Sequence, residues 1–521
     1  MKQSFTHRQW ILLTCLGIQL AGWLWITLLS RGVGSAGFAY EVDNDATPTW
    51  LYFWIQFSLG LVILLTFTLL RKKPLPGKAV WITVVTGAML LRFVAVFGEP
   101  IHESDFYRYI WDGNVTRAGV NPYRLEPGAL LIRENEIHFT FDDPTTGVPW
   151  RGRKFSAEEE ESLSTLQALR DLNPRYFERI SHPAVTTIYP PVAQGFFWLT
   201  QVSFDHSLMG FRAWLVGIDI AVIVILLSLL KRFHLPPVAA ILYGWNPLPI
   251  KEFANSAHYD VLAILFMLAA IGAAISIRSR LKATISVVGL IALGTLTKYF
   301  AVLLLPILLI YLAERNDRKR RRLTLHLKDP HHWIAVTGFV TLLGLAFFPW
   351  LSWQNAGSAE VFRGLQTYGK FWEYNQGGFA LIMKGVQEAF AEREAFQIAR
   401  KMAAALLCLT VAIMGLFSQR PIAERCFVAL AALFVLSPTA FPWYFCWALA
   451  FVPFQPRLSW VIFSLLLPLN YIDFHSNGST PLANQTFHGF HLTQLIIWGT
   501  FFLIWIAESI LNKRSIQKSL V

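Results

Sequence analysis

The sequence predicts an all-α, polytopic membrane protein, and its composition carries most of that prediction. Hydrophobic residues make up 54% of the 521 residues, charged residues make up 15%, and the mean hydropathy is +0.44. An ordinary soluble domain has roughly 25% charged residues. Aromatic residues are also abundant, with 41 Phe and 20 Trp. This composition excludes a soluble enzyme, a disordered scaffold and a disulfide-stapled secreted domain.

The charge distribution supports the same class. The 45 Lys and Arg against 33 Asp and Glu give a net charge of +12. The basic residues gather in short clusters between apolar segments, at 71–73, 278 and 280, 318–322, and 513–514. Such clusters follow the positive-inside rule, so we expect a membrane lipid environment and no nucleic-acid partner. The four cysteines all lie in apolar stretches and indicate neither a disulfide framework nor a zinc site.

Apolar segments follow one another along the chain. Each span needs about 20 apolar residues, or somewhat fewer in a tight bundle, and we expect about 12–14 spans. They lie near 10–30, 50–70, 78–98, 190–204, 211–230, 260–277, 282–297, 299–313, 332–350, 401–418, 426–440, 443–455, 458–472 and 491–511. The first has an apolar core too long for a signal peptide, so we interpret it as an anchor.

The basic clusters predict the sidedness. They place the N-terminus in the cytoplasm and the loops 99–188, 351–400 and 473–490 outside. Lys231 and Arg232 fall outside in this alternation unless 190–204 or 238–250 is a re-entrant or interfacial helix. We therefore expect a multi-pass membrane protein whose large polar loops face outward.

Five regions follow from this topology. They are N-terminal helices (1–98), an external loop with an acidic motif (99–188), a central bundle (189–350), a second external loop (351–400) and C-terminal helices (401–521). In the first loop, Ser156 followed by Glu159 is a capping-box signature and predicts a helix over 157–172. No internal repeat is visible, which disfavours the repeat-built transporters.

The first polar cluster lies at the start of the first external loop. If 104–118 is helical, Asp105, Arg108, Tyr109 and Asp112 share one face, and Gly119 and Pro122 end the helix. One interpretation is a charge ladder in which Arg108 bridges Asp105 and Asp112. The other is a carboxylate at the membrane surface that acts as a general base.

A second dense polar set separates two apolar stretches. It contains Lys251, Glu252, Asn255, His258 and Asp260. A Lys251–Glu252 pair with helix capping by Asn255 or Ser256 would be structural. His258 and Asp260 could instead be half of a metal site.

Three further motifs admit both structural and functional interpretations. Tyr189-Pro-Pro with Gln194 opens an apolar helix and is typical of a proline-initiated helix start. Lys298 separates two short spans, either as a snorkelling lysine or as a fixed cation for a phosphate. Trp443 and Tyr444 follow a Pro-rich break, either as interfacial anchors or as rings that stack on a sugar.

These motifs in this order resemble a known family. The stretches SDFYRYIWDGNVTRAGVNPYR, YPPVAQ, WNPLPIKEFANSAHYD, TKYFAVLLLP, KFWEYNQGGFALI and SPTAFPWYFCWAL resemble the bacterial integral-membrane GT-C glycosyltransferases. The branch they are most similar to is the glycosyltransferase-87 and polyprenyl-phosphate-mannose-dependent mannosyltransferase group. The resemblance covers about residues 78–455 and departs at the insertion 124–180.

The resemblance implies a GT-C-like bundle with a large external catalytic loop in a bacterial inner membrane. It implies inverting transfer of a hexose, with mannose first, from a polyprenyl-phosphate donor to a hydroxyl of a glycan or glycolipid. Glu103-Ser104-Asp105 occupies the place of the family's acidic pair, which implies Asp105 as the base, with Glu103 as the alternative. Lys298, with Arg108 or Lys251, would offset the charge of the departing phosphate.

The remaining expected substrate contacts come from the motifs above. They are Tyr109, Asp112, Tyr189, Gln194, Glu252, His258, Asp260, Trp443 and Tyr444. No required cofactor follows from the sequence, and a divalent cation stays open. Two other classes compete with the transferase: a flippase for a lipid-linked sugar, in which Asp219 and Arg212 would be buried charges, and a non-catalytic assembly subunit.

Overall fold

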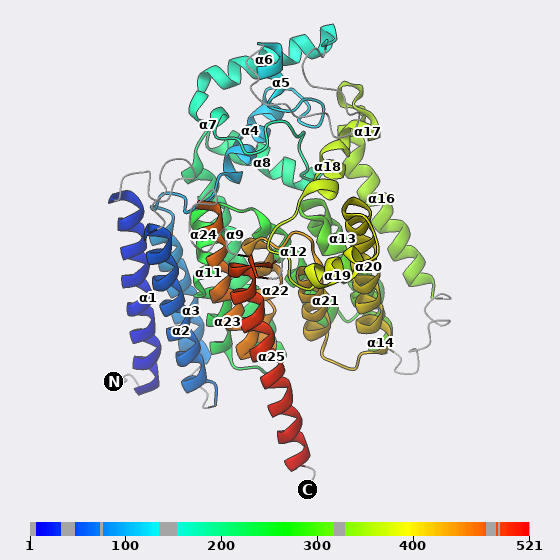
Figure 1. Cartoon of the computed structure of the whole chain (residues 1–521). Helices are drawn as coiled ribbons and strands as arrows, with labels where there is room; N and C mark the ends of the chain where they lie inside the picture. Colours follow the sequence, from blue (N-terminus) through cyan, green and yellow to red (C-terminus); the bar gives the residue numbers. More distant parts are fainter. Residues whose placement is uncertain are drawn as a thin grey trace.

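The computed structural model describes residues 7–32, 47–72, 77–134, 154–316, 329–475, 486–487 and 490–519. Its helices form a bundle whose upper end in Figure 1 carries a cap of shorter helices. Both described termini lie at the opposite end (Figure 1). This arrangement confirms an all-α, multi-pass membrane protein.

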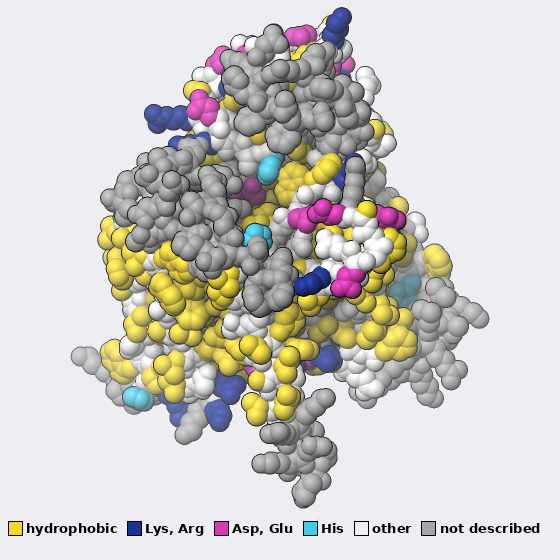
Figure 2. Space-filling model, in the orientation of Figure 1, with side chains coloured by type: hydrophobic (Ala, Val, Ile, Leu, Met, Phe, Trp, Pro, Cys, Tyr) yellow, Lys and Arg dark blue, Asp and Glu magenta, His cyan; other side chains and the backbone are white. Residues whose placement is uncertain are grey.

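Eight described helices are long and apolar enough to cross a membrane. They are α1 (His7–Gly32), α2 (Thr47–Leu70), α3 (Gly77–Ala95), α9 (Leu208–Arg232), α13 (Arg280–Thr297), α16 (Pro330–Ser352), α20 (Glu392–Ala412) and α25 (Leu492–Ser519). Their outward side chains are apolar, with Leu65, Leu345 and Leu503 each at least 60% exposed. Figure 2 shows hydrophobic side chains covering the flanks of the bundle, as a lipid-facing surface requires.

Shorter elements complete the bundle. They are α12 (Asp260–Ser276), the turn η3 (Tyr299–Leu303), α14 (Leu304–Asn316), η5 (Ile413–Phe417), α21 (Ile422–Leu436), α22 (Pro442–Leu449), η6 (Val452–Phe454), α23 (Leu458–Leu466), η7 (Leu467–Leu469) and α24 (Asn470–His475). The expected total of 12–14 spans includes these shorter segments. That they cross the membrane stays a prediction.

One segment of the bundle is broken into short pieces. It runs through η1 (Pro237–Ala240), α10 (Ile241–Gly244), α11 (Pro247–Pro249) and the single π-turn η2 (Ile250–Asn255). The break falls at Asn246, whose Oδ1 accepts the amide hydrogen of Leu248 (3.0 Å) and whose amide donates to Ser464 Oγ (3.0 Å). A proline directly after Asn246 cannot continue the preceding helix, because it has no N–H to donate.

The turns that carry basic residues meet at one end of the bundle. Arg71, after α2, and His234, after α9, line the same cavity. Arg232 donates to Ser276 Oγ (2.9 Å), and Arg315 donates to the carbonyl groups that follow α12. We call this the basic end, and the end that carries α4 the Asp105 end. The expected cluster at 318–322 and the side chains of 513–514 lie outside the described residues.

Helix α8 (Pro191–Ser203) answers the question that the sequence leaves open about Lys231 and Arg232. With 13 residues it is about 20 Å long, whereas the hydrocarbon core is about 30 Å thick. It packs against α4, where a Cβ on Gly113 would lie 2.5 Å from the carbonyl oxygen of Phe197. The expected span at 190–204 is therefore a short helix of the cap beside α4, and the end of α9 lies near Arg71.

The cap is built from the first polar loop. It contains α4 (Asp105–Arg117), α5 (Ala129–Arg133), α6 (Ala157–Leu172) and α7 (Pro174–Glu178). The capping box is present, since Ser156 and Glu159 satisfy each other's backbone N–H groups (3.2 and 2.8 Å). A small apolar core that includes Leu163 and Leu166 holds these helices together.

The second polar loop lies beside the first. After η4 (Trp353–Asn355) it contains α17 (Gly357–Val361), α18 (Arg363–Phe371) and α19 (Gly378–Gln387). Arg363 of α18 donates to Glu126 Oε2 (3.1 Å), and Asn121 donates to the carbonyl oxygens of Trp350 and Trp353 (2.9 and 3.1 Å). One short antiparallel pair, β1 (Thr486–Phe487) with β2 (Phe490–His491), precedes α25.

Candidate functional site

The site begins at the turn between α3 and α4. Arg212, on α9, donates to the backbone carbonyls of residues 96 and 98 (2.7 and 2.9 Å) and to that of Asn255. The Asn255 amide oxygen accepts the N–H of Ile101 (2.9 Å). The turn is therefore fastened to both α9 and η2, which brings Glu103 to the segment that carries His258. Asn255 thus links two segments. One interpretation of the sequence gave it a helix-capping role, which the structure does not show.

Glu103 is committed to structural contacts. Its Oε1 accepts the backbone N–H groups of Ser104 and Asp105 (both 2.9 Å) at the start of α4, and its Oε2 lies 3.2 Å from His258 Nε2. Burial alone would raise the pKa of Glu103, but His258 and Lys251 outweigh it and hold that pKa at about 2. Glu103 is therefore an ionised, positioned anion and a weak base.

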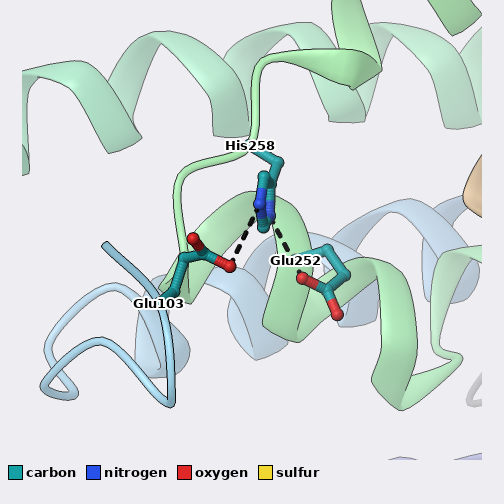
Figure 3. Close-up of side chains that lie close together, drawn as sticks. All are labelled: Glu103, Glu252 and His258. Atoms are coloured by element: carbon teal, nitrogen blue, oxygen red, sulfur yellow. Dashed lines mark ion pairs between the residues drawn. The ribbon is translucent and has the colours of Figure 1, made fainter. Parts of the chain in front are cut away.

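His258 lies between two carboxylates (Figure 3). Its Nδ1 is 3.1 Å from Glu252 Oε2, on the side away from Glu103. Glu252 also pairs with Lys251 Nζ (3.1 Å) and accepts a hydrogen bond from Tyr471. Although burial would lower the pKa of His258, the two carboxylates raise it to about 10. The expected Lys251–Glu252 pair is present, and it supports the histidine.

The same cluster is the described group best placed to hold a metal ion. One ligand atom from each of Glu103, Glu252 and His258 lies within 4.8 Å of the others. The two histidine nitrogens, however, face different carboxylates, so the ring presents only one nitrogen on each side. The protonated His258 and Lys251 already offset the charges of Glu103 and Glu252. The cluster therefore balances its charge with its own residues.

Asp105 differs from Glu103 because it opens onto a cavity. Its side chain is 31% exposed, against 6% for Glu103. Tyr109 OH donates to Oδ2 (3.3 Å) and Ser181 Oγ donates to Oδ1 (3.4 Å). Partial burial and then the charge of Glu103 raise the pKa of Asp105 to about 6, against the opposing effects of His258 and Lys298. The carboxylate is thus a base matched to near-neutral pH.

The cavity beside Asp105 collects residues from distant parts of the chain. It encloses about 910 Å³, counting the space that opens to solvent, which is in the range of about 300–1,000 Å³ usual for ligand sites. Of the expected site residues it is lined by Glu103, Asp105, Arg108, Tyr189, Lys298, Trp443 and Tyr444. Four motifs that are separate in the sequence therefore contribute to one site.

A second cavity adjoins the first. It encloses about 810 Å³ on the same measure and has mostly apolar walls, which include Leu365, Leu433 and Phe434, with Arg400 as a cation. Both cavities are lined by Ile188, Tyr189, Lys298, Tyr368 and Tyr444, so they share a wall.

Lys298 stands at the junction of the two cavities. It interrupts the helical stretch after α13, as the sequence predicts. Its Nζ lies 3.3 Å from Asp260 Oδ1, which also accepts Trp447 Nε1–H (2.8 Å). The rings of Tyr259 and Tyr444 lie 4.9 and 5.0 Å from the same ammonium. Lys298 is therefore held in place, with its side chain 15% exposed.

Several expected contacts lie behind the cavity wall. Arg108 pairs with Asp112 (2.8 Å), and Gln194 donates to Asp112 (3.1 Å). Of the predicted charge ladder, the Arg108–Asp112 pair is present. The Arg108–Asp105 pair is not, because Asp105 accepts hydrogen bonds from Tyr109 and Ser181 instead. Asp112, Gln194, Lys251, Glu252 and Asp260 support the residues that face the cavity.

Other cavity residues escaped the sequence reasoning. They are Ser181 and His182, in the first loop, and Tyr368, Trp372 and Arg400, after α16. Trp372 lies in the stretch KFWEYNQGGFALI, which carries part of the resemblance, but the sequence assigns it no role. A loop residue acquires its role only when the fold brings its loop to the site.

The two charged residues expected in a flippase make contacts that hold the bundle together. Asp219 accepts hydrogen bonds from Arg92 (2.7 Å) and Tyr243 (2.9 Å), and all three residues are fully buried. Arg212 donates hydrogen bonds to backbone carbonyls of the α3–α4 turn. Both contacts fasten helices to one another, which is a structural use of buried charge.

No protein-family model, no curated protein and no solved structure matches this chain. The function is therefore inferred from the geometry of the site itself.

Proposed function

We propose that the protein is an inverting glycosyltransferase. It moves a hexose, with mannose as the first candidate, from a polyprenyl-phosphate donor to a hydroxyl of a glycan or glycolipid. The observation that carries the proposal is that a basic carboxylate, Asp105, and a fixed ammonium, Lys298, face one cavity that adjoins an apolar one. The Asp105 end would face outward from a bacterial inner membrane, because the basic end follows the positive-inside rule.

Asp105 supplies the base. Its carboxylate takes the proton of the acceptor hydroxyl as that oxygen attacks the anomeric carbon. The new carbon–oxygen bond forms while the bond from the anomeric carbon to the phosphate oxygen breaks. One displacement with a general base and no covalent sugar–enzyme intermediate inverts the anomeric configuration. The pKa of about 6 leaves Asp105 ionised at neutral pH and able to accept the proton.

Lys298 offsets the charge of the departing phosphate. A cation fixed before the reaction stabilises charge that develops in the transition state without reorganisation. Arg108 is a second cation at the same cavity, which its side chain lines.

The apolar cavity suits the lipid of the donor. Its leucine and phenylalanine walls fit a hydrocarbon chain, and Lys298 at the junction suits the phosphate at the end of that chain. On the other side of Lys298, Phe441 and Trp443 stack on each other at 4.4 Å and 6°, between the rings of Tyr374 and His258, and both residues line the first cavity. The donor sugar would lie between these rings and Asp105.

An enzyme explains these features better than the two other classes. A flippase needs ionisable groups along a path through the bundle, whereas Arg92 and Asp219 are locked together. An assembly subunit needs no carboxylate with a raised pKa in a cavity.

The test is sugar transfer by the purified full-length protein. Radiolabelled polyprenyl-phosphate mannose is incubated with a crude glycolipid extract, using wild type, Asp105→Asn, Glu103→Gln and the control Asp205→Asn. Asp205 is an acidic residue in the turn after α8, 61% exposed and paired with Arg117. Monodispersity checks folding.

We expect wild type and Asp205→Asn to transfer, and Asp105→Asn to lose at least about a hundredfold in rate. A loss confined to Glu103→Gln would move the base to Glu103. If wild type, Asp105→Asn and Glu103→Gln all transfer equally, or if wild type accepts no polyprenyl-phosphate sugar, the proposed function is wrong.

A further inference from the structure

The first cavity has a wall made where the two polar loops meet. Helix α18 packs directly on the backbone of the first loop, since a Cβ on Gly364 would lie 2.3 Å from the carbonyl oxygen of Thr186. This close approach brings Trp372, which follows α18, against His182, with ring centroids 4.6 Å apart at 67°. We call these two rings the His182–Trp372 wall.

The backbone at His182 is unusual. Its φ is 52°, in the left-handed region that residues other than glycine rarely adopt. Such conformations persist where the surrounding structure holds them, often at binding sites. The preceding residue, Ser181, donates a hydrogen bond to Asp105. The wall is therefore tied to the carboxylate through adjacent residues.

The wall lies on the side of the site away from the apolar cavity. Asp105, His182 and Trp372 line the first cavity and are absent from the lining of the second. Lys298, Tyr368 and Tyr444 line both, and the two tyrosine hydroxyls lie 2.8 Å apart. The order along the site is the apolar cavity, then Lys298, then Asp105 with the wall.

A single displacement requires the nucleophile and the leaving group on opposite sides of the anomeric carbon. If the phosphate leaves at Lys298, the incoming hydroxyl arrives from the part of the first cavity that Lys298 does not occupy. Asp105 and the His182–Trp372 wall are in that part. An aromatic ring offers a flat face of negative potential to the weakly positive C–H face of a sugar.

We propose that the His182–Trp372 wall is the acceptor subsite, where a sugar ring of the acceptor stacks on Trp372 and presents a hydroxyl to Asp105. The inference rests on the proposed function and adds the place and chemical class of the acceptor. Ser181 and His182 supply polar groups beside the stacked ring.

The experiment separates acceptor binding from donor chemistry. The full-length protein is assayed in detergent with polyprenyl-phosphate mannose in two ways. Without acceptor, water attacks the anomeric carbon, gives its proton to Asp105, and releases mannose and polyprenyl phosphate. With a glycolipid extract, transfer is measured as the amount of extract is raised to saturation. The variants are Trp372→Ala, Trp372→Phe and His182→Ala.

Two matched controls accompany them. Phe371→Ala removes the neighbouring ring of α18, which is 50% exposed and lines neither cavity. His234→Ala removes another histidine with left-handed backbone (φ 56°), at the basic end. Both controls should match wild type in both assays.

We expect Trp372→Ala to raise the half-saturating amount of extract by about tenfold, with the donor KM and hydrolysis within about twofold of wild type. Trp372→Phe should restore most of the loss, and His182→Ala should raise the half-saturating amount less. An equal rise in the donor KM would assign the wall to the donor and overturn the inference. So would unchanged saturation in Trp372→Ala, or wild type that hydrolyses the donor but glycosylates nothing in the extract. If wild type neither hydrolyses nor transfers any polyprenyl-phosphate sugar, the proposed function itself fails.

Discussion

Replacing Asp105 by Asn should remove activity and change stability in a way that depends on pH. The folded protein raises the pKa of this carboxyl from 3.8 to about 6. A group with a raised carboxyl pKa stabilises the folded state while it is protonated. That contribution is lost as pH rises from the unfolded value through the folded one. Asn cannot ionise, so it does not incur this loss.

The size of the effect follows from the two pKa values. At about 1.36 kcal/mol per pH unit, the full difference is about 3 kcal/mol. Because the side chain is 31% exposed, solvent screening reduces it to about 1–2 kcal/mol. Asn also loses an acceptor for one of the two donors, Tyr109 and Ser181, at a cost of about 1 kcal/mol.

Asp105→Asn should therefore be less stable than wild type by about 1 kcal/mol near pH 4. Near pH 7.5 it should be equal or slightly more stable, so the difference shifts by about 1–2 kcal/mol in its favour. Reversible denaturation in mixed micelles at both pH values measures this shift, with Asp205→Asn as the exposed control. A stability difference that is the same at both pH values would refute the raised pKa and, with it, the reason for choosing Asp105 as the base.

The remaining predictions concern the same site. Transfer by wild type should lose activity in acid with a midpoint near pH 6 and fall to roughly a tenth one unit below it, because protonated Asp105 cannot accept the hydroxyl proton. In Glu103→Gln that midpoint should lie at lower pH, since a neighbouring negative charge is gone; a midpoint that moves upward in a pH–rate profile would contradict this electrostatic assignment. Lys298→Gln should lower kcat by about 10²–10³ with the protein still folded, and an unchanged kcat would exclude Lys298 as the cation at the phosphate. EDTA should leave the initial rate unchanged, because His258 and Lys251 already balance the carboxylates; loss with EDTA and recovery with a divalent cation would show a metal requirement.

Local features of the sequence predicted the local structure well. The apolar segments appear as helices, the capping box at Ser156 starts α6 at Ala157, and the face that begins at Asp105 becomes α4. Lys298 separates two helical segments as expected. These features depend on hydrophobic runs and on hydrogen bonds between residues close in the chain, so they can be read from the sequence.

The site depended on contacts that the sequence could not reveal. The sequence put Asp105 first as the base and Glu103 second, on the resemblance alone. The structure separates them, because Glu103 is held by His258 and two backbone amides, whereas Asp105 opens onto the cavity. Burial and the charge of Glu103 raise the pKa of Asp105, whereas His258 and Lys251, about 150 residues away in the sequence, lower that of Glu103. Burial and the charge of distant neighbours set such differences, and neither is a property of the local sequence.

By itself the sequence determined that this chain is a helical, multi-pass membrane protein, because its charge content is low and its apolar segments are long enough to cross a membrane. Only the tertiary structure decided that α8 packs against α4, that Lys298 lies between two cavities, and that Trp372 contacts His182. The helices and their membrane class depend on the length and hydrophobicity of continuous segments, which are local properties of the sequence. The other features arise from packing between segments far apart in the chain, which only the folded structure can place together.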